Sequence, residues 1–176
     1  SSILKGEIAF MKQLVKWLGS KCNWNLCYRA SRDGWSTPHF HRHCDNKGPT
    51  VVLVKANGCI FGGYTDQHWD SGGAWKNSTS SFLFSLRNND NLPPFIANIK
   101  QGQEQSAVLG HHGCGSIFGS GPDLIIRNNP QAVQQSFCNF GKTYQLPPGY
   151  VFGSKKARDL LAGQYYFLTT EIEVFN

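Results

Sequence analysis

Hydrophobic residues recur at two spacings along this chain of 176 residues, and the spacings predict helices near both ends with strands between them. Near the N-terminus, five apolar residues follow the three-to-four-residue spacing of one helix face: Leu4, Ile8, Met11, Val15 and Leu18. Gly19 follows the last of them and predicts the end of this helix. We expect the apolar stripe to cover a sheet.

A hairpin is the clearest pattern in the middle of the chain. Residues 50–56 form a β-branched run that is typical of a buried strand. Asn57-Gly58 is a strong two-residue hairpin signal, and residues 59–65 follow as the returning strand. We expect Phe61 to fill the core and Gly63 to allow another backbone to approach closely.

The remaining pattern alternates short strands with turns rich in Gly, Pro and Asn. Further strands are predicted at 24–30, 81–87, 95–99, 107–109, 116–118, 124–127 and 165–175. Ser36 and Ser154 are predicted to cap short helices, and residues 66–80 are predicted to form a long exposed loop. The fold class is therefore α+β, mainly β: a two-sheet antiparallel β-sandwich with flanking helices near both ends, in a single domain over residues 1–176.

Four ordered segments resemble the TLDc domain, the module of the oxidation-resistance (OXR) family. They are SRDGWS…FHRHCDNKGPTVVLVKANGCIFGGYT at 31–65, SFLFSL at 81–86, FGSGPDLII at 118–126 and EIEVF at 171–175. The similarity spans nearly the whole chain, which looks like a stand-alone TLDc domain. It implies the same sandwich and a non-enzymatic interaction module linked to oxidative-stress resistance, a role that in several members accompanies binding of the vacuolar proton pump (V-ATPase).

The charge and composition of the chain limit the classes of binding partner that we expect. The chain has 17 basic and 11 acidic side chains, a formal charge of +6, which suits weak attraction to anionic lipids, acidic proteins or polyanions. The basic residues are scattered without a nucleic-acid-binding motif, so no nucleic acid is expected. No run is apolar and long enough for a transmembrane segment, and the N-terminal pattern differs from a signal peptide. We expect a cytoplasmic protein, with secretion as the alternative.

Candidate catalytic and metal-binding residues are few. His39 and His43 have the i, i+4 spacing of metal ligands on a helix, and His111 and His112 lie beside Cys114. No third ligand accompanies His39 and His43, and the adjacent side chains of His111 and His112 should diverge, so solvated or packed side chains are the simpler interpretation. The six cysteines include no CxxC pair, and no nucleophile elbow, phosphate loop or dinucleotide fingerprint is present. We therefore expect no metal, no cofactor and no enzymatic activity.

The first and the last of the segments that resemble the TLDc domain contain a set of charged residues. Arg32 and Asp33 belong to a predicted turn, and Glu171 and Glu173 share one face of the last strand. Paired carboxylates can perform acid/base chemistry, accept hydrogen bonds from turns, or pair with Arg29 or Arg32. The matching acidic positions are characteristic of the family, and the structural roles are favoured.

An aromatic and polar set supports a different hypothesis. Trp69 and Trp75 lie with Asp66 and Asp70 in the predicted loop at 66–80. Exposed tryptophan beside acidic side chains suits a sugar, which stacks on the ring. This set predicts the alternative function, a secreted lectin that binds a glycan. In the competing interpretation Trp69 belongs to the edge of the core and only Trp75 is exposed.

Overall fold

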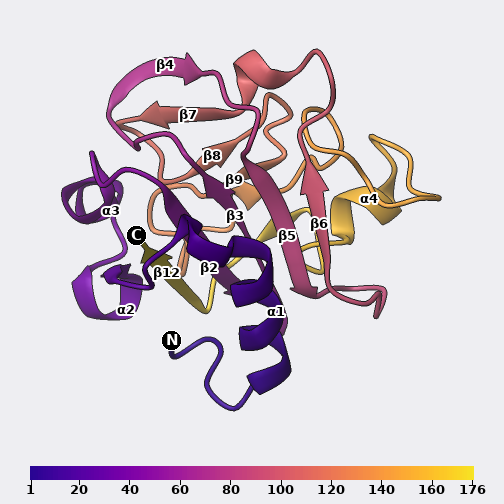
Figure 1. Cartoon of the computed structure of the whole chain (residues 1–176), viewed down its shortest axis with the longest axis horizontal. Helices are drawn as coiled ribbons and strands as arrows, with labels where there is room; N and C mark the ends of the chain where they lie inside the picture. The colour runs from indigo at the N-terminus through magenta and orange to yellow at the C-terminus, as the bar shows by residue number, and fades with distance from the viewer.

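Two six-stranded antiparallel sheets form the centre of the computed structural model, which describes residues 1–176 (Figure 1). The first sheet has the order β1 (Leu26–Arg29), β12 (Glu171–Phe175), β2 (Thr50–Ala56), β3 (Cys59–Thr65), β5 (Phe82–Arg87) and β6 (Phe95–Asn98). The second has the order β11 (Tyr166–Phe167), β10 (Ser136–Phe137), β9 (Leu124–Ile125), β8 (Ile117–Phe118), β7 (Val108–His111) and β4 (Gly72–Lys76). The predicted α+β sandwich is confirmed.

The predicted hairpin of β2 and β3 lies inside the first sheet. Asn57 and Gly58 have φ angles of 52° and 77°, as a type I′ turn requires, and Ala56 pairs with Cys59. Every residue of β3 is buried, and β2 is buried except at Lys55. A hairpin buried on both faces needs cover from two sides.

The two faces of the first sheet contribute to separate apolar clusters. One cluster lies between the sheets and includes Phe61 from β3 and Phe118 from β8. A Cβ atom on Gly63 would lie 2.6 Å from the Phe118 ring, so the glycine allows the close approach of an aromatic side chain and not, as we expected, of another backbone. The other cluster is covered by the N-terminal residues Ile3 and Leu4 and by helix α1 (Ile8–Leu18).

Short helices occupy the margins of the sandwich. They are α2 (Ala30–Asp33), α3 (Thr37–Cys44), α4 (Lys155–Asp159) and the single-turn 3-10 helices η1 (Gly19–Lys21) and η2 (Glu104–Ser106). The Ser36 side chain accepts a hydrogen bond from the His39 backbone, and Ser154 accepts one from Ala157, so both predicted caps are confirmed. No helix combines the length and apolar character needed to cross a membrane.

The predicted facing of the α1 stripe is only partly correct. Leu4 and Leu18 are buried against the sheet as expected, together with Leu14, whereas Ile8, Met11 and Val15 are 64%, 43% and 49% exposed. The apolar arc of the helix also includes the partly buried residues Phe10 and Trp17, and the sheet packs against that side of the arc. The expected core stripe is therefore largely a surface feature.

Three other local expectations need correction. The predicted loop at 66–80 contains strand β4, an edge strand whose Trp75 pairs with Leu109 of β7. The predicted turn at Arg32-Asp33 is the end of the short helix α2. The predicted strand at 165–175 is divided between β11 and β12, which belong to different sheets.

Replacement of Phe61 by alanine tests the core between the sheets. Phe61 is fully buried and meets Phe167 edge to face, with ring centroids 5.6 Å apart. We expect Phe61→Ala to lower the free energy of unfolding by about 3–5 kcal/mol in urea titrations. The matched control is Phe152→Ala, because Phe152 is 42% exposed and its loss should cost less than about 1 kcal/mol. Equal costs for the two variants would contradict this packing.

Candidate functional site

A charged corner forms where β1 enters α2 beside β12. Arg29 is paired in register with Glu173, and its Nε and Nη2 atoms donate to Oε2 of that carboxylate at 3.0 and 2.8 Å. Glu173 is fully buried. A buried carboxylate is stable only when it is paired and hydrogen-bonded, so the fold requires the contact between Arg29 and Glu173.

The same carboxylate also holds the N-terminal segment. Glu173 accepts hydrogen bonds from the Ser1 hydroxyl at 2.5 Å, the Ser2 backbone N–H at 3.0 Å and the Ile3 backbone N–H at 3.3 Å. Burial by itself would raise the pKa of Glu173, but the donors from Ser1, Ser2, Arg29 and Ile3 outweigh burial and lower it. The charged form is therefore part of the fold.

The other acidic residues of the corner are engaged in local structure. Glu171 accepts hydrogen bonds from the Ser31 backbone N–H at 3.1 Å and the Ser31 hydroxyl at 2.5 Å, so it satisfies a free donor at the start of α2. Asp33 accepts from the Arg29 backbone at 2.9 Å and pairs with Arg32 at 2.8 Å. The Arg32 hydrogen bonds lower the pKa of Asp33 to about 2. Each carboxylate at this corner thus has partners within the chain.

The charged side chains of the corner, those of Arg29, Arg32, Asp33, Glu171 and Glu173, line none of the cavities of the structure. The hollow lined in part by Tyr28, Trp35 and Ile172 lies on the opposite face of β12 from the two glutamates and has a volume of about 10 Å³. This volume suits a single water molecule. Arg32 is the accessible charged residue of the predicted set, with half of its side chain exposed. The geometry favours a surface contact.

The predicted aromatic set is divided between the core and the surface. Trp69 is fully buried, and its indole N–H donates to the Thr50 hydroxyl at 2.9 Å. It cannot stack on a ligand from this position, and so it is a core residue. Trp75 on β4 is 43% exposed and can do so.

The acidic members of this set stabilise their own segment. Asp66 accepts a hydrogen bond from the Ser78 hydroxyl at 2.6 Å. Asp70 pairs with Lys76 at 2.6 Å and accepts from the Gly72 backbone at 3.0 Å, and the Lys76 contact lowers the pKa of Asp70. Both aspartates therefore have partners within their own segment.

The predicted histidine pairs do not converge on a metal site. His39 Nδ1 lies 2.8 Å from the Ser36 hydroxyl, and the rings of His111 and His112 stack with centroids 4.5 Å apart. His43 lies beside the ring of Tyr28. The structure contains no group of three or more His, Cys, Asp or Glu side chains placed to hold a metal ion.

His41 is a structural contact that the sequence argument missed. Its Nδ1 lies 2.7 Å from Asp45, and its Nε2 lies 2.8 Å from the carbonyl oxygens of both His111 and Cys114. This buried ring links α3 to the last residue of β7 and to the loop that follows it. The i, i+4 spacing of His41 and Asp45 was a local signal for half of the arrangement.

The FGSGPD segment contains Asp123, and the contacts of this residue show that the segment has a structural role. Its buried carboxylate accepts backbone hydrogen bonds from Gly141, Thr143 and Tyr144 at 3.0–3.1 Å. Burial raises the pKa of Asp123 although these donors oppose the shift. A Cβ atom on Gly119, where φ is +79°, would lie 2.2 Å from this carboxylate, so glycine is required there.

The two glutamates of β12 provide a matched test of the corner. Glu173→Gln removes the charge that pairs with Arg29, and we expect a loss of about 3–5 kcal/mol in the free energy of unfolding. Glu171→Gln removes a charge from a half-buried position that pairs with no basic side chain and binds the two donors of Ser31, and should cost less than about 1.5 kcal/mol. Urea titration of both variants measures the difference. Similar costs would show that Glu173 does not anchor the fold.

Acid titration tests Asp33 separately. Its pKa in the folded chain is about 2, below its ordinary value of 3.8, so its contribution to stability is present above pH 3.8 and is lost as the pH falls through about 2. Asp33→Asn lacks this charge. We expect the stability difference between the wild type and the variant to shrink as the pH is lowered through this window. Parallel stability curves across the window would contradict the assignment.

Comparison with known proteins places the chain in a family. The family model described as the TLDc domain matches residues 1–176. MTOR-associated protein MEAK7 of Danio rerio is 33% identical over 69 residues, which cover 39% of this chain and 15% of that protein, and MEAK7 of Gallus gallus is 34% identical over 64 residues, which cover 36% and 14%. Oxidation resistance protein 1 of Yarrowia lipolytica is 35% identical over 81 residues, which cover 42% and 35%. The matches thus span between 14% and 35% of these relatives. The chain belongs to the TLDc domain family.

Proposed function

We propose that this chain is a non-enzymatic protein-interaction module that acts in resistance to oxidative stress by binding and modulating the V-ATPase in the cytoplasm. The observation that carries the proposal is the TLDc match over residues 1–176, together with the relative named oxidation resistance protein 1. Interaction modules of this kind need a stable surface more than a reactive group.

The engagement of the acidic residues supports a binding role. Glu171 and Glu173 each accept several hydrogen bonds from their own chain, and neither lines a cavity of the structure. Cys114, the cysteine that follows His111 and His112, is buried. A general acid or base must reach a bound substrate, and these groups already serve the fold.

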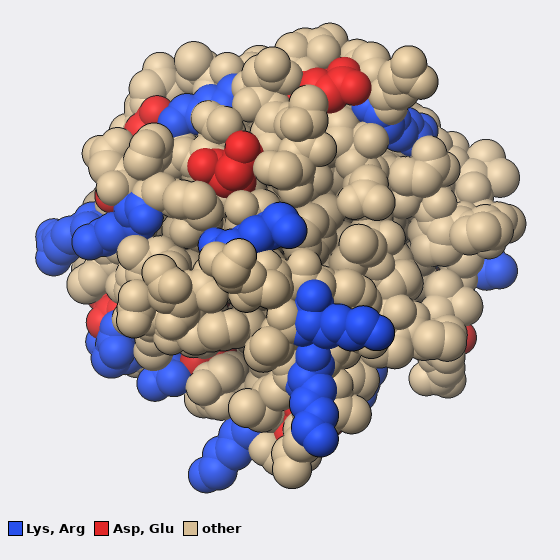
Figure 2. Space-filling view, viewed as in Figure 1, with Lys and Arg blue, Asp and Glu red and all other residues tan.

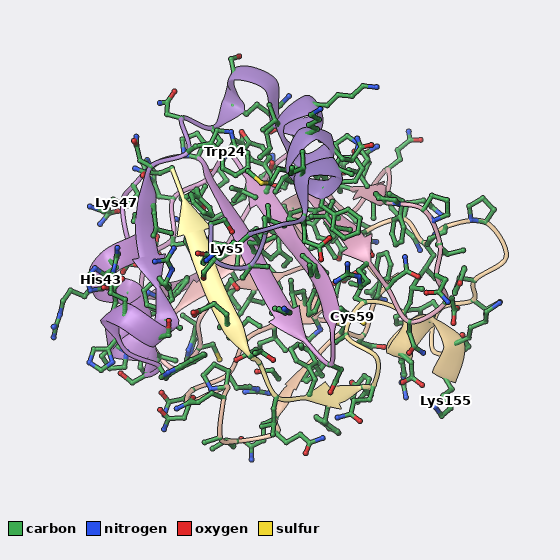
Figure 3. All side chains as sticks on the ribbon, turned by 90° about the horizontal axis from the view of Figure 1, so that it is seen from below. Lys5, Trp24, His43, Lys47, Cys59 and Lys155 are labelled. Atoms are coloured by element: carbon green, nitrogen blue, oxygen red, sulfur yellow. The ribbon has the colours of Figure 1, made fainter.

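The exposed rim of the corner is the proposed contact surface. Arg32 at the end of α2 is half exposed, and Arg42 of α3 and Lys47 beyond it are exposed without an ion-pair partner. Figure 2 shows basic side chains on the left of the molecule, where Figure 1 places α2 and α3, and Figure 3 shows His43 and Lys47 projecting there. A basic rim of this kind suits an acidic patch on a protein partner.

Carbohydrate binding by a secreted protein is the second candidate. It is favoured by one observation, the exposed indole of Trp75 on the edge strand β4. A stacked sugar also needs polar groups beside the ring, and the nearby acidic residues Asp66 and Asp70 bind Ser78 and Lys76 instead. The protein-interaction proposal therefore has the stronger support.

Binding of the chain to purified V-ATPase separates the two candidates. We expect the double variant Arg32→Ala, Arg42→Ala to bind about ten-fold more weakly, because two rim charges are lost. Trp75→Ala and the control Lys142→Ala, Lys156→Ala should retain wild-type affinity.

A glycan array and calorimetry test the second candidate, carbohydrate binding. Absence of V-ATPase binding, with a sub-millimolar sugar hit abolished by Trp75→Ala, would replace the first proposal with the second.

A further inference from the structure

Helix α1 presents an apolar face to the outside of the molecule. Ile8, Met11 and Val15 share this face because successive helical residues are about 100° apart. The face adjoins the buried arc that contains Leu14 and Leu18. The apolar part of the α1 surface is thus wider than the part that packs on the sheet. The apolar residues that do not pack on the sheet form one contiguous strip.

The strip continues into a shallow groove beside the helix. The groove has a volume of about 250 Å³ and is lined by Ser1, Leu4, Met11, Val15, Trp24 and Phe175. Trp24 meets Phe175 edge to face at 5.3 Å and remains half-buried, and Figure 3 shows it beside α1. An indole at the margin of an apolar strip has the position that tryptophan adopts at a membrane interface.

Charges of one sign accompany the strip. Lys12 and Lys16 lie on its exposed flank, and Lys5 and Lys21 precede and follow the helix. All four lysines are exposed, and none forms an ion pair. The acidic residue of this region, Glu7, is paired with Arg87 at 2.7 Å. Figure 2 shows basic side chains over the lower part of the molecule, where Figure 1 places α1.

We propose that this face of α1 docks on the surface of an anionic phospholipid membrane. Ile8, Met11, Val15 and Trp24 would enter the boundary between headgroups and acyl chains, while the lysines pair with phosphate and carboxylate groups. Lysine side chains suit this arrangement because their stems lie along apolar surface and their ammonium groups remain in the headgroup layer. The proposal goes beyond the interaction proposed for the corner at α2 and α3.

The chemistry of the face favours a lipid surface over a protein groove. Its charges are all basic and extend along the whole helix, which matches a diffuse anionic surface. The buried polar side-chain atoms that lack partners are in Ser85, Ser116, Asn139, Arg158 and Thr169. None of these residues lines the groove, so it contains no unmet hydrogen bond that would demand a specific polar partner. The buried side of α1 stays on the sheet, so docking needs no unfolding.

Vesicle cosedimentation tests the proposal directly. Vesicles of phosphatidylcholine with about 30 mol% phosphatidylserine should bind the chain, whereas pure phosphatidylcholine should not. Roughly 0.5 M NaCl should weaken binding, because screening shortens the reach of the lysines. Soluble dihexanoyl phosphatidylserine below its micellar concentration supplies the headgroup without an interface and should not bind. Equal binding to that soluble lipid would indicate headgroup recognition and overturn the insertion proposal.

Substitutions on exposed positions identify the face. Met11→Asp and Val15→Asp should each weaken vesicle binding about ten-fold or more, because a carboxylate would enter the apolar boundary. Val151→Asp is the control, since Val151 is 69% exposed in a loop. Lys12→Glu with Lys16→Glu should cause a similar loss, and Lys142→Glu with Lys156→Glu is its charge-matched control, because both lysines are exposed outside either proposed surface. Circular dichroism should show that all variants fold.

Fluorescence provides a second measurement, which shows which part of the bound chain contacts the lipid. Brominated lipids should quench part of the tryptophan emission, and Trp24→Phe should remove most of that quenching. Failure of wild-type chain to bind anionic vesicles would overturn the proposal, as would undiminished binding of the Met11→Asp and Val15→Asp variants. A dimer in solution that Met11→Asp dissociates, without vesicle binding, would assign the face to a second copy of the chain.

Discussion

Burial of both faces of the first sheet is the constraint on which the rest of this structure depends. β2 and β3 have continuous apolar runs, which are stable only between two covering layers. The second sheet covers one face, and α1 with Ile3 and Leu4 covers part of the other. A helix about 10 Å wide covers only about two strands spaced about 4.8 Å apart, so the segment before the helix must also lie on the sheet. Four hydrogen bonds from residues 1–3 to Glu173 hold that segment in place.

The features predicted correctly from the sequence are those that local interactions determine. The turn at Asn57-Gly58 and the caps at Ser36 and Ser154 each depend on residues within four positions of one another. Strand β4 was missed because its residues, including two glycines, have no strand pattern of their own. It forms by pairing with β7, more than 30 residues away, and such partners are not visible in a local window.

The facing of α1 and the contacts of the candidate residues could not be predicted for a related reason. Apolar residues occupy about half of the helix circumference, so periodicity allowed two faces and tertiary packing selected the one with Leu14 and Leu18. Trp69 and Trp75 lie close in sequence, yet one is in the core and the other is on an edge strand. Glu173 was predicted as a candidate, and Arg29 was among its possible partners. Its contacts with residues 1–3 span about 170 positions and follow from no motif.

Glu173 also connects the two surfaces that we propose to bind partners. Arg29 is the last residue of β1 and directly precedes α2, while Ser1, Ser2 and Ile3 lead into α1. One buried carboxylate binds both groups, so it fixes the path by which the chain enters each helix. The positions of the rim at α2 and of the apolar face of α1 therefore both depend on Glu173, although this residue is fully buried and belongs to neither surface. An acidic residue at this position of the EIEVF segment shapes both surfaces without having to contact either partner.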